Sequence, residues 1–429
     1  MQKYAWLTEL EKFGVGFVGA GWIVNTHHVK AWRGVRNADI MAICDIDEKR
    51  AKNTAALCRE LNVGNPKVYT DVSRMAADPQ VNAIWVTVPN YARIPVVKAI
   101  TEEVTQGKSE LVGLVCEKPL GRNAKEARQM LEMVEKAKLL HGYLENQVFM
   151  PSLVKGKGLL WKKGATAAGR PYLVRCSEEH GGPHEAWFWD ASRQGGGALN
   201  DMLCHSIEAA RFLLTAPDEA KEALTPRTVS AEIATLKWAR PEYVEQLIKM
   251  TKGSVDYSKK PAEDTGRASI VYETKDGSLV VSELTTSWSF VASERVTIEM
   301  LGPEYYMQID TLNPEMKVFF SREIKESGGE EMIEKQAAEQ GFMPVVPDET
   351  HAYGYLEEDR HMVESFLNGK MPRETWKDGA LVVELIMTCY MAAEKGKRLS
   401  FPPEGLKDFV PKVAQGTWSP RDIAKPASK

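Results

Sequence analysis

The sequence predicts an α/β protein of two domains: a doubly wound parallel sheet, then an α+β domain with a large, mostly antiparallel open sheet. Its 429 residues exceed what one hydrophobic core usually holds. Up to about residue 146, short apolar runs alternate with longer amphipathic ones. From about residue 151, strand-like segments follow one another with few helices between them.

The first domain, residues 1–146, alternates apolar runs of strand length with segments whose apolar residues have helical spacing. This alternation predicts a parallel sheet with helices on both faces. The strand candidates are residues 15–18, 40–44, 83–88 and 111–116. The helix candidates are residues 47–61, 91–105 and 123–139.

The second domain, residues 147–402, consists mainly of strand candidates bounded by turn residues, which favours an open, largely antiparallel sheet. The strand candidates are residues 171–178, 229–237, 268–274, 279–288, 296–301, 305–309 and 317–320, and late helices are expected at 355–367 and 378–395. Residues 239–264 are polar and interrupt the strands, so we interpret them as an insertion without an assigned role. The tail, residues 403–429, is rich in proline and lysine and is expected to wrap over the surface or fray.

Composition excludes several classes of function. A net charge of −4 gives no broad attraction for nucleic acid. The six cysteines are scattered, with no Cys-x-x-Cys pair, as is typical of reduced thiols in a cytosolic protein. Residues 1–13 lack the apolar stretch of a signal peptide, and the longest apolar segment, residues 380–393, is interrupted by Glu384. We therefore expect a soluble, cytoplasmic protein without membrane or nucleic-acid partners.

A glycine-rich turn at residues 16–24 joins the first strand candidate to a helix. Glycines let the backbone turn tightly and approach a pyrophosphate, whose charge the helix N-terminus attracts. Val24 occupies the third glycine position of the G-x-G-x-x-G/A pattern, so a plain strand-to-helix turn remains the alternative. Cofactor contacts are expected at Gly19, Gly21, Trp22 and Ile23.

Asp45 follows the second strand candidate, 24 residues after Gly21 and near the spacing expected of a ribose-binding acid. A carboxylate there bonds the ribose hydroxyls and repels a 2′-phosphate. Because Ile46 and Asp47 supply no cation, NAD is favoured over NADP. A role for Asp45 as N-cap of the next helix is compatible with this one.

Glu117 and Lys118 come directly after a buried strand candidate and are followed by Pro119. In an open α/β sheet, ligands bind outside the carboxyl ends of the strands, so both side chains are expected where cofactor and substrate meet. A surface ion pair is the alternative.

Asp201 and His205 follow the glycine run at residues 195–197 and stand four residues apart on a predicted helix. They therefore share one face. Histidine titrates near neutrality, and a carboxylate can orient it, so the pair suits acid–base chemistry. A hydrogen bond on a helix surface is the alternative.

Together, the glycine turn, the Glu117-Lys118-Pro119 triplet and the Asp201/His205 segment resemble the Gfo/Idh/MocA family, the relatives of glucose–fructose oxidoreductase and inositol dehydrogenase. The likeness extends to residues 378–402 near the end. The resemblance implies a Rossmann domain, a C-terminal domain whose open sheet often forms an oligomer interface, and hydride exchange between NAD(P) and a sugar hydroxyl carbon. A homo-oligomer, a dimer or a tetramer, is expected.

The same resemblance implies roles for individual residues. Lys118 would bind or polarise the reacting oxygen, His205 would take the hydroxyl proton, and Asp201 would hold substrate or orient His205. Pro89 and Asn90, like Glu117, match cofactor-contacting positions, and this chain has Arg93 where the family often has histidine.

Acids, histidines and tryptophans at residues 178–190 suit a sugar pocket, in which aromatic rings stack on a pyranose. Packing of the two tryptophans in the core is the alternative. A metal site built from His180, His184, Asp201 and His205 is disfavoured, because a loop H-x-x-x-H lacks helical pairing, and we expect no metal. Substrate contacts are expected at His180, His184, Trp187, Trp189 and Asn146.

The sequence leaves two other functions open. An NAD-dependent glycoside hydrolase would oxidise the sugar transiently, eliminate the aglycone, add water and reduce the ketone again, with His180 and His184 as further acid or base. A non-enzymatic nucleotide-binding sensor is disfavoured because Lys118, Asp201 and His205 are all present.

Overall fold

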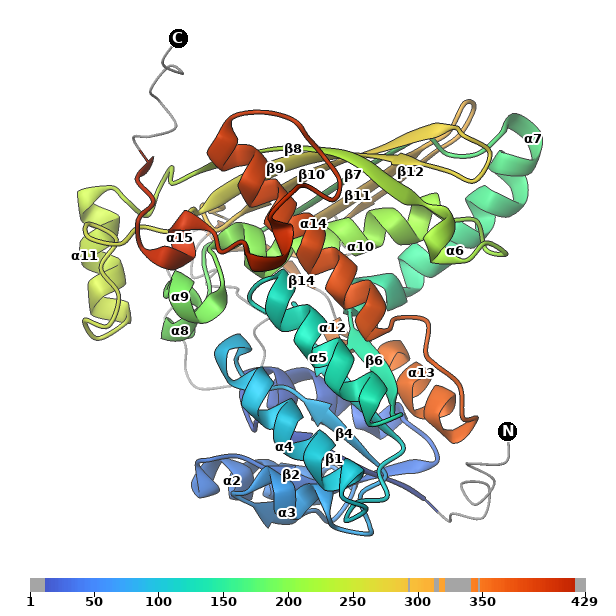
Figure 1. The fold of residues 1–429 in the computed structure, drawn as a ribbon, viewed down its shortest axis with the longest axis vertical. Coiled ribbons are helices and arrows are strands. Elements are labelled where there is room, and N and C mark those ends of the chain that lie inside the picture. The colour runs from blue at the N-terminus through green and yellow to red at the C-terminus, as the bar shows by residue number, and fades with distance from the viewer. Residues whose placement is uncertain (1–11, 292–293, 312–315, 321–340, 346–347, 421–429) are drawn as a thin grey trace. The chain divides into compact units, whose positions relative to one another are not determined.

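The computed structural model (Figure 1) describes residues 12–291, 294–311, 316–320, 341–345 and 348–420. The predictions for the first eleven residues and for the end of the tail, residues 421–429, lie outside this range. The chain divides into two compact units. One comprises Met1–Pro151 and Thr350–Val383, and the other Ser152–Glu349 and Glu384–Lys429.

The first unit contains a six-stranded parallel sheet with the order β3-β2-β1-β4-β5-β6. This order reverses direction at β1, as in doubly wound nucleotide-binding folds. The predicted parallel sheet is confirmed, and β3 and β6 extend it beyond the four strand candidates. The strands are β1 (Phe13–Val18), β2 (Ala38–Cys44), β3 (Lys67–Tyr69), β4 (Ala83–Val86), β5 (Gly113–Glu117) and β6 (Leu140–Leu144).

Several helices of the first unit begin at polar caps. Asp47 accepts hydrogen bonds from Lys49 N and Arg50 N before α2, and Asn123 accepts one from Glu126 N before α5. The helices are α1 (Val29–Ala31), α2 (Glu48–Glu60), α3 (Val72–Ala76), α4 (Arg93–Thr105), α5 (Ala124–Lys136), α13 (Tyr355–Leu367) and the start of α14 (Trp376–Lys395).

A segment from late in the sequence completes the first unit. Trp376 donates from its indole nitrogen to Gly142 O and from its backbone to His141 Nδ1, and Tyr143 N donates to Glu374 O. These bonds tie Glu374 and the first residue of α14 to β6. Residues 350–383 thus belong to the unit of the parallel sheet, although more than 200 residues separate them from β6.

The second unit contains a seven-stranded sheet with the order β12-β11-β7-β10-β9-β8-β15. Only the β7–β10 pair is parallel, so the predicted mostly antiparallel sheet is confirmed. The strands are β7 (Leu173–Glu179), β8 (Thr225–Ala234), β9 (Thr265–Glu273), β10 (Leu279–Ser287), β11 (Arg295–Leu301), β12 (Tyr306–Asp310) and β15 (Leu399–Ser400).

One strand candidate lies outside this sheet. The predicted strand at 317–320 forms as β13 (Met316–Phe320), but it pairs with β14 (Gly341–Val345) in a separate two-stranded sheet. One edge of the large sheet is formed by β15, from near the end of the chain, which pairs with β8. A short apolar run fixes the strand but not its partner, because pairing depends on distant backbone.

Helix α10 (Ala198–Leu214) packs on one face of the large sheet (Figure 1). All of its residues are buried. On outward-facing positions of the sheet, exposed arginines and glutamates form cross-strand pairs, such as Arg175 with Glu283 (2.8 Å) and Arg267 with Glu232 (2.7 Å). The remaining helices are α6 (Pro151–Leu159), α7 (Thr166–Ala168), α8 (Ala186–Trp189), α9 (Ala191–Gln194), α11 (Pro241–Met250), α12 (Glu349–Ala352) and α15 (Lys412–Gln415).

The segment 239–264, interpreted above as an insertion, supports the start of α10. It forms α11 and returns to the sheet at Glu263. The Glu263 carboxylate accepts hydrogen bonds from Gly197 N (2.8 Å), Leu199 N (3.1 Å) and the Tyr390 hydroxyl. The first backbone amides of a helix have no partner within the helix, and Glu263, a buried acid, accepts hydrogen bonds from two of them at the start of α10.

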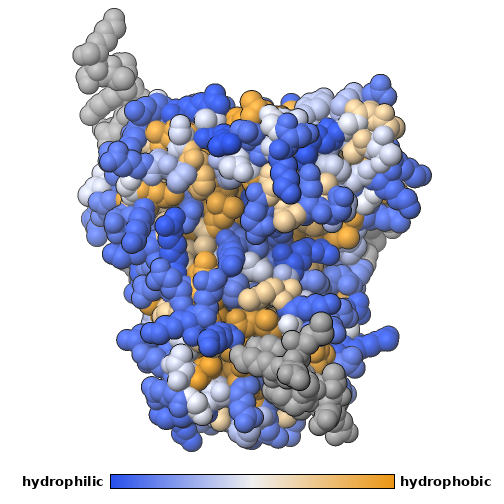
Figure 2. Space-filling view, turned by 45° about the vertical axis from the view of Figure 1, so that its right-hand side comes forward, coloured by the Kyte–Doolittle hydropathy of each residue, from blue (hydrophilic) through white to orange (hydrophobic). Residues whose placement is uncertain are grey.

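Hydrophilic residues cover most of the face drawn in Figure 2, with hydrophobic residues in patches between them. In the part of the chain that the structure describes, no helix is both long enough and apolar enough to cross a bilayer.

Glu263 predicts a specific pH dependence of stability. Burial raises the pKa of its carboxyl from 4.5 to about 7. The folded state therefore retains a proton that the unfolded state loses between about pH 4.5 and 7, and stability falls as the pH rises through this window. At about 1.4 kcal/mol per pKa unit, the loss is roughly 3 kcal/mol. Glu263→Gln keeps an acceptor for Gly197 N but cannot ionise.

We expect the urea midpoint of Glu263→Gln to exceed that of wild type by more at pH 8 than at pH 5. Glu404→Gln, on the exposed segment before α15, is the control. Parallel pH dependence of wild type and Glu263→Gln would contradict the prediction.

Candidate active site

The glycine turn after β1 is shaped for close approach of a ligand. Gly19 has φ +100°, and a Cβ there would lie 2.9 Å from the backbone of Thr87 and Val88, so only glycine fits. A Cβ on Gly21 would meet nothing within 4 Å, so this position opens onto free space in front of the helix. An open backbone cradle at a helix start fits a pyrophosphate.

Trp22 and Ile23 begin the helical segment after the turn, and Val24 opens a π-helical stretch, Val24–His28. Val24 is fully buried at the position where the glycine pattern has a small residue for close helix–strand packing. π-helical turns within helices are frequent at functional sites. The larger residue is thus accommodated within a helix that is locally widened.

Asp45 lies beside the glycine turn. Its Oδ2 accepts a hydrogen bond from Ala20 N (2.8 Å), and its Oδ1 accepts one from Asp47 N (2.9 Å). The N-cap of α2 is Asp47, so the alternative role of Asp45 as that cap is wrong. The structure therefore joins the acid after β2 to the turn after β1, as a dinucleotide site requires.

The loop after β4 is tied to the end of β5 by Arg93. Pro89 precedes a short 3-10 helix, Asn90–Ala92, and Asn90 is buried. Arg93 donates to Val88 O (3.2 Å), to Lys118 O (3.0 Å) and to Pro119 O. Arginine, with its five fixed donors, therefore holds two loops together at the carboxyl edge of the sheet.

Glu117 ends β5, and its Oε2 accepts a hydrogen bond from the backbone nitrogen of Lys118 (3.0 Å). Burial disfavours ionisation of Glu117. Hydrogen bonding and charge from His28, with charge from Lys118 and Arg93, nevertheless hold the pKa of the carboxyl below its usual value. Lys118 thus lies at the carboxyl end of β5, with its backbone bonded on both sides.

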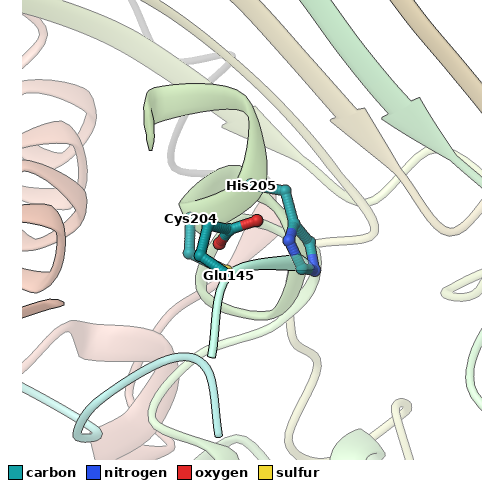
Figure 3. Close-up of side chains that lie close together, drawn as sticks. All are labelled: Glu145, Cys204 and His205. Carbon is teal, nitrogen blue, oxygen red and sulfur yellow. The ribbon is translucent and has the colours of Figure 1, made fainter. Parts of the chain in front are cut away.

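In the second unit, α10 carries Asp201 and His205, which are 4% and 4% exposed. Figure 3 shows His205 and its neighbour Cys204 extending from this helix. Asp201 Oδ2 accepts a hydrogen bond from the Trp288 indole (3.2 Å) and lies 4.0 Å from His180 Nε2. Both candidate groups are therefore buried, not on a helix surface.

Glu178, at the end of β7, approaches the same helix. Its Oε1 lies 4.0 Å from His205 Nε2. His180 is fully buried, and its Nδ1 accepts a hydrogen bond from Gly182 N (2.9 Å). Two carboxylates and two imidazoles therefore gather between the end of β7 and the start of α10, a set of groups able to donate and accept protons.

The remaining substrate candidates differ in their surroundings. Trp189 is 1% exposed, donates to Pro183 O (2.8 Å) and packs against Trp238 and Trp288, which supports the alternative of core packing. Trp187 is half-buried and stacks on Phe188, and His184 is exposed. In the first unit, Asn146 donates to Tyr353 O (2.8 Å).

Sequence reasoning missed the residues that hold these groups in place. Trp288 and Glu263 contact Asp201 and the start of its helix from positions 87 and 66 residues away. Arg93, noted in the sequence only as a departure from the family pattern, bonds to Lys118 O. Glu178 could have been found from the sequence, because it begins the acidic and aromatic stretch at 178–190 that predicted a sugar pocket. Its closeness to His205, however, depends on the packing of β7 against α10.

Comparison with known proteins gives two family matches. A family model described as "Oxidoreductase family, NAD-binding Rossmann fold" matches residues 13–143. A second, "GFO/IDH/MocA C-terminal domain", matches residues 164–306. Between them they cover both the parallel sheet and most of the antiparallel sheet.

The chain is also similar to curated enzymes. It is 23% identical over 371 residues to myo-inositol 2-dehydrogenase of Thermotoga maritima, covering 86% of this chain and 93% of that protein. It is 25% identical over 235 residues to D-apiose dehydrogenase of Paraburkholderia graminis, which covers 53% of this chain but only 56% of that protein.

Two solved structures share the fold across nearly the whole chain. GenD2 from gentamicin A biosynthesis, in complex with NAD, has a TM-score of 0.71 and 22% identity over 91% of this chain and 97% of its own. Levoglucosan dehydrogenase, in complex with NADH and L-sorbose, has a TM-score of 0.65 and 19% identity over 92% and 100%.

The predicted dinucleotide site therefore coincides with an NAD-binding domain, and the predicted resemblance is confirmed in both halves of the chain. This protein belongs to the Gfo/Idh/MocA oxidoreductase family, with an NAD-binding Rossmann domain followed by the C-terminal domain of that family.

Proposed function

We propose that this protein transfers a hydride between NAD and a hydroxyl-bearing carbon of a sugar or polyol. Residues 1–146 would bind NAD, and residues 147–402 would bind the substrate. The observation that carries the proposal is Lys118, a cation at the carboxyl end of β5 whose backbone is held by Glu117 and Arg93. Ligands of open α/β sheets bind at this edge. The named activities of the inositol, apiose and levoglucosan dehydrogenases support the substrate class.

In this mechanism the substrate hydroxyl loses its proton to His205, and the Lys118 ammonium stabilises the negative charge that develops on the oxygen. Glu178, 4.0 Å from His205, favours the protonated imidazole that results. Asp201, held by Trp288, binds the substrate or orients His205. Bound NAD supplies the hydride acceptor in one direction and the donor in the other.

A preference for NAD over NADP is supported by Asp45. Its carboxylate is fixed at the glycine turn, where it would bond ribose hydroxyls and repel a 2′-phosphate. Ile46 beside it is 97% exposed and uncharged, so it offers no cation to a 2′-phosphate.

A second candidate function is NAD-dependent glycoside hydrolysis. Its supporting observation is that Glu178 and His180 lie beside Asp201 and His205, more buried proton-transfer groups than hydride exchange alone needs. Elimination of an aglycone requires a base for the C–H next to the ketone and an acid for the leaving oxygen. His184, which is exposed, is a weaker candidate for either role.

We further propose that the protein forms a homo-oligomer, a dimer or a tetramer, through the outer face of the large sheet. Exposed arginines and glutamates there alternate with half-buried Leu173, Val281 and Leu301. Such a mixed surface can pair with a copy of itself about a two-fold axis.

Removal of the candidate acid–base groups tests the primary proposal. With a panel of myo-inositol, levoglucosan and D-apiose, we expect Lys118→Ala and His205→Ala to lower kcat for NAD reduction by roughly 10²- to 10⁴-fold. Lys98→Ala, an exposed lysine on α4, and His351→Ala, an exposed histidine, are matched controls and should retain wild-type kcat. Full turnover in both site variants would refute the assigned roles, and binding of NAD without turnover of any glycoside or polyol would favour a sensor.

Cofactor choice is tested at Asp45. Asp45→Ser removes the carboxylate that would bond ribose, so the dissociation constant for NAD should rise at least roughly tenfold, while that for NADP changes less. Asp39→Asn, at the opposite end of the same strand, is the control. Titration of intrinsic tryptophan fluorescence measures both constants, and an unchanged NAD/NADP ratio would contradict the prediction.

The two catalytic candidates are separated by incubating the enzyme with an aryl glycoside and NAD in deuterium oxide. Hydride exchange predicts net NADH and no released aglycone. Aglycone release, deuterium at the carbon next to the oxidised one and no net NADH would instead establish hydrolysis.

A further inference from the structure

A fully buried histidine, His28, links the helical segment after the glycine turn to the end of β5. His28 Nε2 lies 3.1 Å from Glu117 Oε1, and His28 Nδ1 lies 3.0 Å from Asp359 Oδ2 on α13. Ionised carboxylates only accept hydrogen bonds, so both ring nitrogens must donate. This requires the imidazolium form. Burial lowers the pKa of His28, but the charges and hydrogen bonds of Asp359 and Glu117 raise it well above the usual value.

The bridge continues to the backbone of Lys118. One carboxylate oxygen of Glu117 accepts a hydrogen bond from His28, and the other accepts one from Lys118 N (3.0 Å). On the far side of the residue, Arg93 donates to Lys118 O (3.0 Å). Both peptide groups that flank the Lys118 Cα are thus fixed by side chains.

The other end of the bridge is anchored in the core. Asp359 Oδ1 accepts a hydrogen bond from the Trp85 indole on β4 (3.0 Å). Glu358, also fully buried, has a pKa raised well above its usual value, chiefly by burial and also by Glu117 and Asp359. His28 thus lies between two carboxyl groups, and Arg93 bonds the backbone at the same end of β5.

We propose that His28 is a positioning residue for Lys118: its imidazolium, clamped by Asp359, orients Glu117 and thereby fixes the peptide from which the Lys118 side chain extends. The proposal rests on the catalytic role proposed above for Lys118. A displacement of about 1 Å at a reacting group can cost roughly a hundredfold in rate, so a rigid bridge of this kind has a catalytic consequence. Through Asp359, the bridge also reaches α13, from late in the sequence.

Two substitutions separate positioning from packing. The amide nitrogen of Asn reaches about as far as Nδ1 of histidine, and that of Gln about as far as Nε2. His28→Asn should keep the bond to Asp359 and lose the one to Glu117, whereas His28→Gln should keep the one to Glu117. Trp85→Phe, which loosens Asp359 but leaves the His28–Glu117 contact, is the control for core destabilisation.

The first measurement needs no substrate. By hydrogen–deuterium exchange of the full chain, the Lys118 amide should exchange at least tenfold faster in His28→Asn than in wild type. It should stay protected in His28→Gln and Trp85→Phe. If His28→Asn does not fold, His28→Met decides, because methionine fills the buried space and donates no hydrogen bond to Glu117. Wild-type protection of Lys118 in the folded variant would overturn the proposal.

The second measurement is steady-state turnover of the panel sugar that wild type uses best. His28→Asn should lower kcat roughly 10- to 100-fold with KM for NAD and sugar within about threefold, and His28→Gln should restore most of kcat. If Lys118→Ala is inactive but His28→Asn has the kcat of wild type, the positioning role is overturned. Full turnover in Lys118→Ala would instead refute the proposed function and leave the bridge to be judged by amide exchange.

Discussion

The parallel pairing of β1 with β2 on one side and β4 on the other is the constraint on which the nucleotide-binding unit depends. At this point the strand order reverses, and the loops after β1, β2, β4 and β5 leave the sheet at the same edge. Gly19 packs against the backbone after β4, Asp45 bonds the turn after β1, and Arg93 ties the loop after β4 to the end of β5. The four loops thereby form one continuous surface at the carboxyl edge of the sheet.

In the second unit, the main feature is the burial of ionisable groups. Helix α10 is enclosed along its whole length, and its first turn has Glu263 as a capping acid. Asp201 and His205 are consequently held in fixed surroundings beside His180 and Glu178. Removal from water strengthens the electrostatic interactions among such groups, which is the usual condition for acid–base chemistry at neutral pH.

Much of this could be predicted from local pattern. The alternation of apolar and amphipathic segments predicted the parallel sheet, and the glycine turn with Asp45 predicted the NAD-binding domain; both are confirmed. The strand at 317–320 was expected in the large sheet but pairs with β14 in a separate one, and the role of residues 239–264 was not predicted at all. The assignments of Lys118, Asp201 and His205 as catalytic residues stay predictions.

The sequence by itself determined the elements and the chemistry carried at their ends, because periodicity and turn residues act over a few positions. Only the tertiary structure decided which distant groups meet them: Asp359 with His28, Glu263 with the start of α10, and Trp288 with Asp201. These contacts join residues separated by 331, 66 and 87 positions. A local pattern does not encode them, because they arise only when the hydrophobic core brings the separate segments together.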